Sequence, residues 1–401
     1  MNILYINHYA GSIYHGMEYR PYFLAREWVK LGHNVTILAS SYSHIRQKNI
    51  VIPEGKNYLK ENIDGINYIW FKTPKYKGNG IKRLINIFVF LWQIKSLRYD
   101  ADLIIASSTY PFDVKVAYKI AKQNNAKLVY EVHDLWPLTL IEINGMPKWH
   151  PFILLMQKAE DFAYKHADKV VSLLPKAKEY MVHHGMMPNK FIYIPNGIDI
   201  KQIKEPLPNE HQKIINKLRE AKDFLIGYAG GIGEANALDY LLTAAKILDK
   251  NVAFILMGEG INKEKLLKRL NDEKINNVIF LSAVSKQQVA TFLEQMDALY
   301  IGWKNLPIYR FGICPNKIFD YMLSKKPIIH SNSLANDLVK EANCGISVLA
   351  EDSNAIANAI KEMMFMQKDE LAELGKNAYN YVIKYHDYSI LANNFLEECF
   401  L

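Results

Sequence analysis

Short apolar runs rich in Ile, Val and Leu recur along the chain and alternate with longer segments of helical periodicity. Runs that are apolar on both faces are typical of strands buried in a parallel sheet. In the first half this pattern predicts strands at Ile3–Ile6, Val35–Ala39, Ile66–Phe71, Leu103–Ala106, Leu128–Val132, Val170–Leu173 and Ile192–Ile194. In the second half it predicts strands at Leu225–Tyr228, Ala253–Met257, Val278–Leu281, Ala298–Ile301, Pro327–His330 and Ile346–Leu349.

Helices are expected between most of these strands, for example at Glu18–Leu31, Ala237–Leu248 and Ser285–Gln295. Strands that alternate with helices predict right-handed β-α-β units and open parallel sheets. A chain of 401 residues exceeds the usual size of a single core. We therefore predict an α/β fold with two doubly wound, Rossmann-like domains that face a cleft, at residues 1–200 and 201–376.

Ligands of such sheets bind outside the carboxyl ends of the strands, so the loops there are the first place to look for chemistry. One strand runs into glycines and then a helix, in Asp223-Phe-Leu-Ile-Gly-Tyr-Ala-Gly-Gly-Ile-Gly233. A second loop, Arg310-Phe-Gly-Ile-Cys-Pro-Asn-Lys-Ile-Phe-Asp-Tyr-Met322, has a proline just inside a new helix. A bare helix N-terminus favours a phosphate group. The two loops together predict a nucleotide diphosphate site that includes Gly230, Gly231, Pro315 and Asn316.

Three basic residues, Lys304, Arg310 and Lys317, lie close to this second helix start in the sequence. Each alone is an ordinary surface base, but together they suit a diphosphate leaving group. Asp320, deeper in the helix, could accept both hydroxyls of a ribose or be a solvated acid on the helix face.

Two further loops follow strands of the second half. Met257-Gly258-Glu259-Gly260 has glycines that allow close approach by a base or a ribose. Leu281-Ser-Ala283-Val284 could offer backbone groups to a nucleobase.

Tyr130-Glu-Val-His-Asp-Leu-Trp-Pro137 ends a predicted strand of the first half. His133 could donate to a substrate hydroxyl or act as acid or base near neutral pH, or it could simply bond to neighbouring backbone groups. Its place at the end of a strand favours the functional interpretation.

Asp100 and Asp102 resemble a metal-binding pair but precede the strand at Leu103, at the end away from the expected cleft. Asp168 and Asp297 precede strands in the same way, so we interpret all of them as strand-entry acids. We expect neither a metal nor a cofactor at this pair. The third glycine of a dinucleotide fingerprint, a Walker-type loop, a Gly-x-Ser-x-Gly elbow and a Cys/His cluster are all absent from the sequence.

The net charge of +8 is compatible with anionic lipid, nucleic acid or phosphorylated small molecules. Segment 81–98 has an apolar centre, too short to span a bilayer, flanked by Lys82, Arg83, Lys95 and Arg98. It could lie in an anionic membrane surface or pack against the first sheet with solvated ends. Scattered cysteines and an N-terminus that enters a strand at once predict a cytoplasmic protein. The basic charge and segment 81–98 fit a location that is peripheral on the inner face of the plasma membrane.

These motifs in this order resemble the family 4-type glycosyltransferases of GT-B fold, which transfer a sugar from a nucleotide sugar with retention. The resemblance runs nearly end to end and rests on Gly32-His-Asn-Val-Thr-Ile-Leu38, Val132-His-Asp134, Pro195-Asn-Gly-Ile-Asp199, Gly258-Glu-Gly260 and Phe319-Asp-Tyr-Met322. Gly16-Met-Glu-Tyr-Arg-Pro-Tyr22 and Ser43-His-Ile-Arg46 resemble a subgroup that builds bacterial surface polysaccharides, often with N-acetylated 6-deoxy sugars.

The resemblance implies that the first domain holds a lipid-linked saccharide acceptor and the second a nucleotide sugar, without a metal. His133 would lie near the transferred sugar, Gly16 near the diphosphate and Asp320 on the ribose. A helix at about 377–401 would cross back to the first domain. The residues expected to contact the acceptor are Tyr14, His15, Arg20, His44, Arg46 and Asp134.

Two features depart from the family pattern. Gly312 stands eight residues before Asp320, where the family has a Glu, and the usual Arg and Lys are missing from Gly230–Leu238. We expect Lys317 and Arg310 to replace the missing bases as catalytic residues beside His133. A nucleotide-sugar epimerase of GT-B type and a basic membrane or nucleic-acid binding module are the alternatives; no aromatic–basic interleaving supports nucleic acid.

Overall fold

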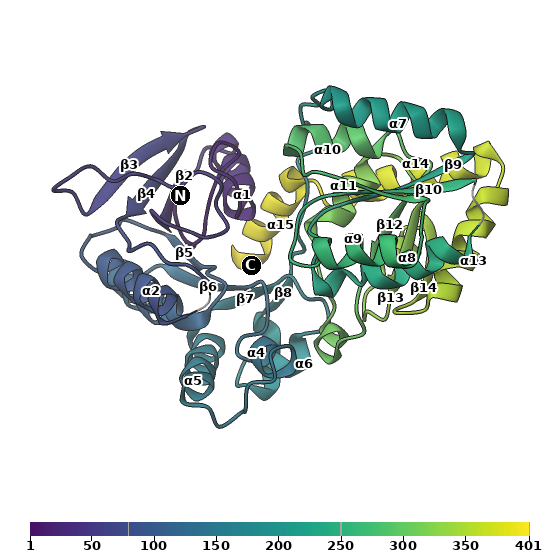
Figure 1. Ribbon diagram of the computed structural model, residues 1–401. Helices are drawn as coiled ribbons and strands as arrows, with labels where there is room; N and C mark the ends of the chain where they lie inside the picture. Colours follow the sequence, from purple (N-terminus) through teal and green to yellow (C-terminus); the bar gives the residue numbers. More distant parts are fainter. Residues whose placement is uncertain (79, 249–250, 401) are drawn as a thin grey trace. The chain divides into compact units, whose positions relative to one another are not determined.

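The computed structural model describes residues 1–78, 80–248 and 251–400. The chain divides into two compact units. The first comprises Met1–Asn196, Phe311–Cys314 and Tyr388–Leu401, and the second comprises Gly197–Arg310 and Pro315–Asp387. Each unit is built around one sheet with helices on its faces (Figure 1). Both sheets are parallel and doubly wound apart from one edge strand, as the sequence pattern predicts.

The sheet of the first unit has the strand order β3-β4-β2-β1-β5-β6-β7-β8. The strands are β1 (Asn2–Ile6), β2 (Asn34–Ser40), β3 (Tyr58–Ile63), β4 (Ile66–Phe71), β5 (Leu103–Ala106), β6 (Lys127–Val132), β7 (Lys169–Ser172) and β8 (Phe191–Tyr193). The sequence pattern misses β3, which pairs antiparallel with β4 at the edge. The polar run Lys60-Glu-Asn62 hides this strand, although Asp64-Gly65, both at positive φ, form the hairpin turn typical of such a pair.

Two layers of helices cover this sheet. On one face α1 (Arg20–Lys30) packs against α15 (Tyr388–Phe400) over a core that includes Trp28, Trp70 and Phe395. The longer helices elsewhere in the unit are α2 (Ile81–Ile94), α3 (Val114–Asn124) and α5 (Pro151–His166), which right-handed connections place on the opposite face. The short helices are η1 (Pro111–Asp113), α4 (Leu138–Glu142), α6 (Lys178–His183) and η2 (Pro188–Lys190).

The sheet of the second unit has the order β11-β10-β9-β12-β13-β14. Its strands are β9 (Phe224–Ala229), β10 (Val252–Met257), β11 (Val278–Leu281), β12 (Ala298–Gly302), β13 (Ile328–Asn332) and β14 (Gly345–Leu349). The helices are α7 (Asn209–Ala221), η3 (Glu234–Asn236), α8 (Leu238–Ile247), α9 (Lys263–Asp272), α10 (Lys286–Leu293), η4 (Pro307–Phe311), α11 (Asn316–Leu323), α12 (Leu338–Glu341), α13 (Ser353–Phe365) and α14 (Lys368–Tyr385). Phe311, the last residue of η4, is grouped with the first unit.

The predicted C-terminal helix at 377–401 is in fact two helices; residue 401 lies outside the described part. The backbone carbonyl of His386 accepts a hydrogen bond from the N–H of Ile198 at 2.8 Å, and Asp387 forms a bridge with Ile198. This pairing with a loop interrupts the helix between α14 and α15. Only the part from Tyr388 onward is grouped with the first unit, and residues 377–387 stay with the second.

The strand-entry acids have a direct structural role. Asp102 accepts from the backbone N–H of Asn2 at 2.8 Å, and Asp168 and Asp297 accept from Leu128 and Leu225 at 2.7 Å. Each carboxylate therefore satisfies the amide of the first or second residue of the neighbouring strand. Asp100 accepts from the side chain of Asn2. These contacts explain Asp100 and Asp102 without a metal.

Candidate active site

Two glycine-containing loops of the second unit lie against each other at the carboxyl ends of β9 and β10. Gly230 N–H donates to the Met257 carbonyl at 3.0 Å, and Ile232 N–H donates to the Glu259 carbonyl at 2.8 Å. A Cβ on Gly258 would lie 1.9 Å from the Gly230 oxygen, and one on Gly260 would lie 2.2 Å from the Ile232 oxygen. The adjoining loop is therefore a structural reason for glycine at 258 and 260, while the close approach of a base or a ribose stays a prediction.

Gly231 differs from these glycines, because a Cβ there would meet no atom of the described residues within 4 Å. Its carbonyl accepts from the hydroxyl of Tyr228 and the side chain of Asn236. The helix predicted at Ala237–Leu248 is α8, which begins at Leu238, and the short turn η3 lies between the glycines and this helix. The loop at Gly231 is therefore held by hydrogen bonds from Tyr228 and Asn236, and the space beside the Cα of Gly231 is open.

Lys317, in the first turn of α11, is the base that the structure places at this loop. A Cβ on Gly230 would lie 3.5 Å from its Nζ. The ammonium donates to the hydroxyl of Tyr228 at 3.1 Å and to the Asn236 side chain, and it lies over the rings of Tyr228 and Trp303 at 4.9 and 5.0 Å. Burial lowers the pKa of Lys317 to about 7. Burial makes the charged form of Lys317 costly, and an anionic ligand beside it would offset that cost.

The start of α11 differs slightly from the prediction. Pro315 is the N-cap, with extended backbone, and the helix begins at Asn316, which is exposed. The Pro315 cap position has no side-chain hydrogen bond. The first turn of α11 thus presents its backbone N–H groups next to Lys317, as an anion site requires.

The other predicted bases have different surroundings. Lys304 pairs with Glu234, whose hydrogen bond raises the pKa of Lys304. Arg310, an exposed residue of η4, donates to the Pro307 carbonyl at 2.7 Å. Glu234 lies within Gly230–Leu238, the stretch in which the family usually has an Arg and a Lys. Its carboxylate neutralises the charge of Lys304.

The predicted ribose and base contacts lie on neighbouring elements of the same unit. Asp320 is held by an ion pair with Lys286, at the start of α10. Glu259 pairs with Lys263 at 2.7 Å, and this hydrogen bond lowers the pKa of the Glu259 carboxyl. Ala283 is exposed and Val284 half-buried in the loop between β11 and α10. Asp320 must exchange Lys286 for a ribose if it is to bind one.

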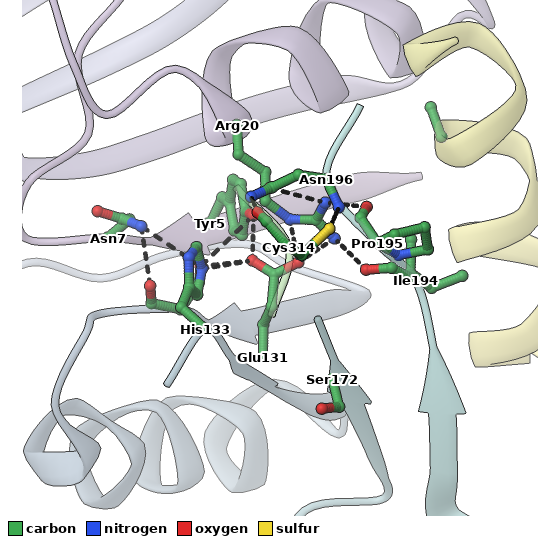
Figure 2. Close-up of polar contacts among 12 residues, drawn as sticks. Tyr5, Asn7, Arg20, Glu131, His133, Ser172, Ile194, Pro195, Asn196 and Cys314 are labelled. Atoms are coloured by element: carbon green, nitrogen blue, oxygen red, sulfur yellow. Dashed lines mark hydrogen bonds and ion pairs between the residues drawn. The ribbon is translucent and has the colours of Figure 1, made fainter. Parts of the chain in front are cut away.

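In the first unit, His133 belongs to a buried charged cluster at the end of β6 (Figure 2). Its Nε2 lies 3.2 Å from the Glu131 carboxylate and 2.9 Å from the Ser107 hydroxyl. Glu131 also accepts from Tyr5 at 2.6 Å and pairs with Arg20 at 2.9 Å. Glu131 is fully buried, and four side chains share its two oxygens.

This cluster sets the protonation of its members. Burial opposes the charge of Glu131, but Arg20 and His133 outweigh it and hold the pKa of that carboxyl well below its usual range. Burial also opposes a charged His133, yet the hydrogen bond and charge of Glu131 raise the pKa of His133 above its usual value. The cluster therefore favours the protonated form of His133 and fixes the orientation of its ring.

Arg20 and Arg46 do not fit the acceptor role predicted for them. Arg20 is buried and donates to the carbonyls of Pro195 and Ile194 at 2.6 and 3.1 Å, in addition to its pairing with Glu131. Arg46 is buried against the ring of Trp70 at 4.9 Å and donates to the carbonyls of Ser40 and Ala10. Both guanidiniums are buried and bonded to backbone carbonyls of the first unit, so neither is presented to an acceptor, although Nε of Arg46 has no hydrogen-bond partner among the described residues.

The remaining first-unit candidates lie in two loops and beside His133. His15 is buried and bonds to Ser12, whereas Tyr14 is exposed and its hydroxyl lies 3.4 Å from Asp64. His44 is exposed and bonds to Tyr76 at 2.7 Å. Asp134 is exposed next to His133.

Gly16 has a positive φ of 96°, and a Cβ there would lie 2.9 Å from the Gln47 nitrogen. It lies in a tight turn in which Ser12 and Gly16 form a bridge. Its conformation fixes the loop between β1 and α1, where the family resemblance implies a contact with the diphosphate.

Sequence reasoning missed several residues that build these two sites. Glu131 is an acid within the apolar strand Leu128-Val-Tyr-Glu-Val132. Because a buried acid requires partners, its position in this strand could have predicted a buried polar cluster. Tyr5 and Ser107, its neutral partners, carry no comparable signal. Tyr228 and Trp303 around Lys317 read as ordinary core aromatics.

One group of potential metal ligands exists among the described residues. Glu160, Asp161 and His184 bring one ligand atom each to within 4.8 Å of one another. Asp161 and His184 already pair at 3.0 Å, and the buried Glu160 accepts from Tyr164 and Tyr180. None of the three belongs to the cluster of His133 or the loop of Lys317.

Comparison with known proteins places the chain in a family. The family described as Glycosyltransferase Family 4 matches residues 14–202, and Glycosyl transferases group 1 matches residues 223–365. The probable glycosyltransferase WbjE of Pseudomonas aeruginosa is 21% identical over 76% of this chain and 77% of its own length. The putative colanic acid biosynthesis glycosyl transferase WcaI of Escherichia coli K12 is 21% identical over 68% of this chain and 69% of its own.

Solved structures share the fold of the whole chain. Anabaena Alr3699/HepE in complex with UDP-glucose superposes with a TM-score of 0.67 at 15% identity, covering 99% of this chain and 98% of the other. A structure described as trehalose-6-phosphate from E. coli bound with UDP-2-fluoro glucose gives 0.74 at 11% identity, covering 100% and 99%. The superpositions show the GT-B fold, and the two family matches show that the chain belongs to glycosyltransferase family 4 and is an enzyme that transfers a glycosyl group from a nucleotide sugar.

Proposed function

We propose that the enzyme transfers a sugar, with retention and without a metal, from a UDP-linked donor to a lipid-linked saccharide acceptor in bacterial surface polysaccharide synthesis. The second unit binds the donor and the first binds the acceptor. Similarity to WbjE and WcaI supports the polysaccharide setting, and similarity to the UDP-glucose complex of Alr3699/HepE supports a uridine nucleotide. An N-acetylated 6-deoxy hexosamine is the first donor sugar to test.

The surroundings of Lys317 carry this proposal. The ammonium lies beside Gly230 with neutral hydrogen-bond partners, and the first turn of α11 follows directly. A departing diphosphate would gain a charge-assisted hydrogen bond and the amides of a helix end. Lys317 thereby takes over from the bases that the family has after the glycine strand. Such fixed charges stabilise a leaving group as a metal would.

His133 is proposed to act on the transferred sugar. Nε2 is held by Glu131 and Ser107, so the ring is oriented from one side and its other nitrogen is the one that could meet a substrate. A protonated ring can donate to a sugar hydroxyl or to charge that develops near it. Asp134 and the exposed Tyr14 and His44 remain candidates for the acceptor.

Turnover of Lys317→Ala tests the proposal. We expect UDP-sugar consumption and glycoside formation to fall at least tenfold, about the loss of one charge-assisted contact. Lys361→Ala, at an exposed lysine of α13, is the matched control and should be unchanged. Unchanged turnover in Lys317→Ala would refute the role of Lys317. Activity that disappears with a chelator would refute the metal-free mechanism, and an inverted anomeric configuration by NMR would refute retention.

A further inference from the structure

The first unit exposes large apolar side chains along one side of α2. Ile81, Ile85, Phe88 and Trp92 follow one another at spacings of four, three and four residues and are all exposed, Trp92 by 70%. This spacing places them on one face of a helix. The opposite face of α2 packs against the sheet, and its buried residues include Ile87, Phe90, Leu91 and Ile94. The outer face is therefore not needed to hold the helix in place. Packing against the sheet explains the apolar residues on the inner face of α2 but not the exposed apolar side chains on its outer face.

A second exposed apolar group lies at α4 and α5. Trp149, in the loop before α5, is 75% exposed, and Ile143, Leu154 and Leu155 are exposed around it. Phe112 connects the two groups: its ring lies 5.7 Å from Phe88 of α2 and 6.2 Å from Phe152 of α5. Figure 1 shows α2, α4 and α5 along the lower side of the first unit. We call these eight exposed side chains the docking face: Ile81, Ile85, Phe88, Trp92, Ile143, Trp149, Leu154 and Leu155.

Basic residues outnumber acidic ones around the docking face. Segment 81–98 contains four basic residues and no Asp or Glu. Segment 143–159 contains Lys148 and Lys158, with Glu142 directly before it and Glu160 and Asp161 directly after it. Lys82, Lys95, Arg98, Lys148 and Lys158 are all exposed. Apolar and indole side chains surrounded by exposed cations match the interface of an anionic bilayer.

We propose that the docking face inserts shallowly into an anionic lipid surface. No helix among the described residues is long and apolar enough to cross a membrane, so the contact is peripheral. Trp92 and Trp149 are the two anchors, since indole rings prefer the depth of the headgroups. The surface does not depend on the proposed glycosyl transfer, because lipid binding needs neither donor nor acceptor.

The inner side of α2 connects the docking face to the acceptor side of the first unit. Asn86 bonds to His8 at 2.6 Å and donates to the Pro74 carbonyl at 2.7 Å. Arg83 donates to the hydroxyl of Tyr9 at 2.9 Å. His8 and Tyr9 belong to the loop that leaves β1 at the carboxyl edge of the sheet. A membrane bound to the outer face of α2 would therefore lie next to the loop where a lipid-linked acceptor is expected.

Co-sedimentation with vesicles tests this surface. Vesicles of phosphatidylglycerol and phosphatidylcholine should bind the wild-type protein at least tenfold better than phosphatidylcholine alone. Phe88→Ser/Trp92→Ser and Trp149→Ser should each lower binding to the anionic vesicles at least tenfold. Phe365→Ser, at an 85% exposed phenylalanine of the second unit, is the matched control and should bind as wild type. Lys82→Glu/Lys95→Glu should remove the preference for anionic lipid.

A spectroscopic readout locates the anchors without removing aromatic side chains. Tryptophan emission should shift to shorter wavelength on vesicle binding and be quenched by brominated lipid, and Trp92→Phe and Trp149→Phe should each remove part of the shift. Unaltered far-UV circular dichroism shows that a variant is folded. Binding equal on neutral vesicles, or lost equally in Phe365→Ser, would overturn the proposal. So would no vesicle binding together with a concentration-dependent dimer that Trp92→Ser abolishes, since the face would then join two protein copies.

Discussion

The two units handle charge at the ends of their strands in opposite ways. In the first unit the carboxylate of Glu131 already has Arg20, His133, Tyr5 and Ser107 around it, and all of these contacts are internal. In the second unit the ammonium of Lys317 has only neutral partners among its described hydrogen bonds, Tyr228 and Asn236. The first arrangement is complete without a substrate, whereas the second gains most when an anion arrives.

The pKa shifts express the same difference. Opposite charges overcome burial at Glu131 and hold its pKa low, so the carboxylate stays ionised. At Lys317 burial acts without a compensating charge and lowers the pKa to about 7. A buried ion pair fixes geometry, while an uncompensated base responds to its ligand. We infer that the first unit supplies orientation and the second supplies the charge that changes during the reaction.

The largest expected effect is on the stability of the first unit. Glu131→Gln keeps the shape of the side chain but leaves Arg20 without its opposite charge, although Arg20 is 2% exposed. Removing one partner of a buried pair costs about 3–5 kcal/mol. Urea unfolding measures this loss, with the two units followed as separate transitions where they separate.

Glu273→Gln provides the control for this measurement. Glu273 pairs with Arg269 at 2.6 Å and with Lys246 at 3.2 Å, but on an exposed surface of the second unit. Exposed pairs contribute about 0–1 kcal/mol, so this change should be small. A loss below about 1 kcal/mol in Glu131→Gln as well would show that the two glutamates are equivalent and would remove the contrast between the units.

The next effect is a linked proton at Lys317. A bound diphosphate should raise the pKa of this ammonium from about 7, so that nucleotide binding at pH 8 takes up a proton. The sign follows directly: the protonated form binds better, and apparent affinity falls as pH rises above 7 until the pKa of the complex is reached. The fall approaches about tenfold per pH unit, the limit for one proton.

Calorimetry in two buffers of different ionisation enthalpy counts the protons taken up with UDP at pH 8. Lys317→Met, which keeps the apolar stem, should abolish the uptake and flatten the pH dependence. Equal proton uptake by wild type and Lys317→Met would assign the proton to another group. The lysine would then be charged before the nucleotide binds, and the second unit would resemble the first.

Most of the fold follows from the sequence because parallel strands buried on both faces leave continuous apolar runs. The predicted Ile66–Phe71, Leu103–Ala106 and Val278–Leu281 match β4, β5 and β11 at both ends. The sequence pattern does not predict the antiparallel strand β3, because this edge strand is half solvated and carries Lys60, Glu61 and Asn62. The break between α14 and α15 is not predicted either, because the backbone of Ile198, which causes it, lies far away in the sequence.

The candidate site is less readable, since its residues depend on partners from distant strands. The proximity of Lys317 to Gly230 was predicted in outline from two loops that each begin a helix. The burial of Arg20 was not, because a basic residue in a helix normally faces solvent, and only Glu131 on another element explains its position. Gly258 and Gly260 were identified as special, but the adjoining loop that requires them could not be read from one sequence.

The smallest effect should come from Lys286→Ala, which removes the partner of Asp320. This pair is partly exposed, with 43% of the lysine side chain accessible, so its loss should change stability by about 1 kcal/mol or less. UDP affinity should stay equal or rise a few-fold, because Asp320 no longer has to release Lys286 before it accepts a ribose. Titration of the variant with UDP, beside Lys361→Ala, measures this. A tenfold fall in affinity would instead mean that Lys286 itself contacts the nucleotide. The second unit would then bind its ligand with two lysines. Lys286 is partly exposed and paired with Asp320, whereas Lys317 is buried and gains its proton when the anion binds.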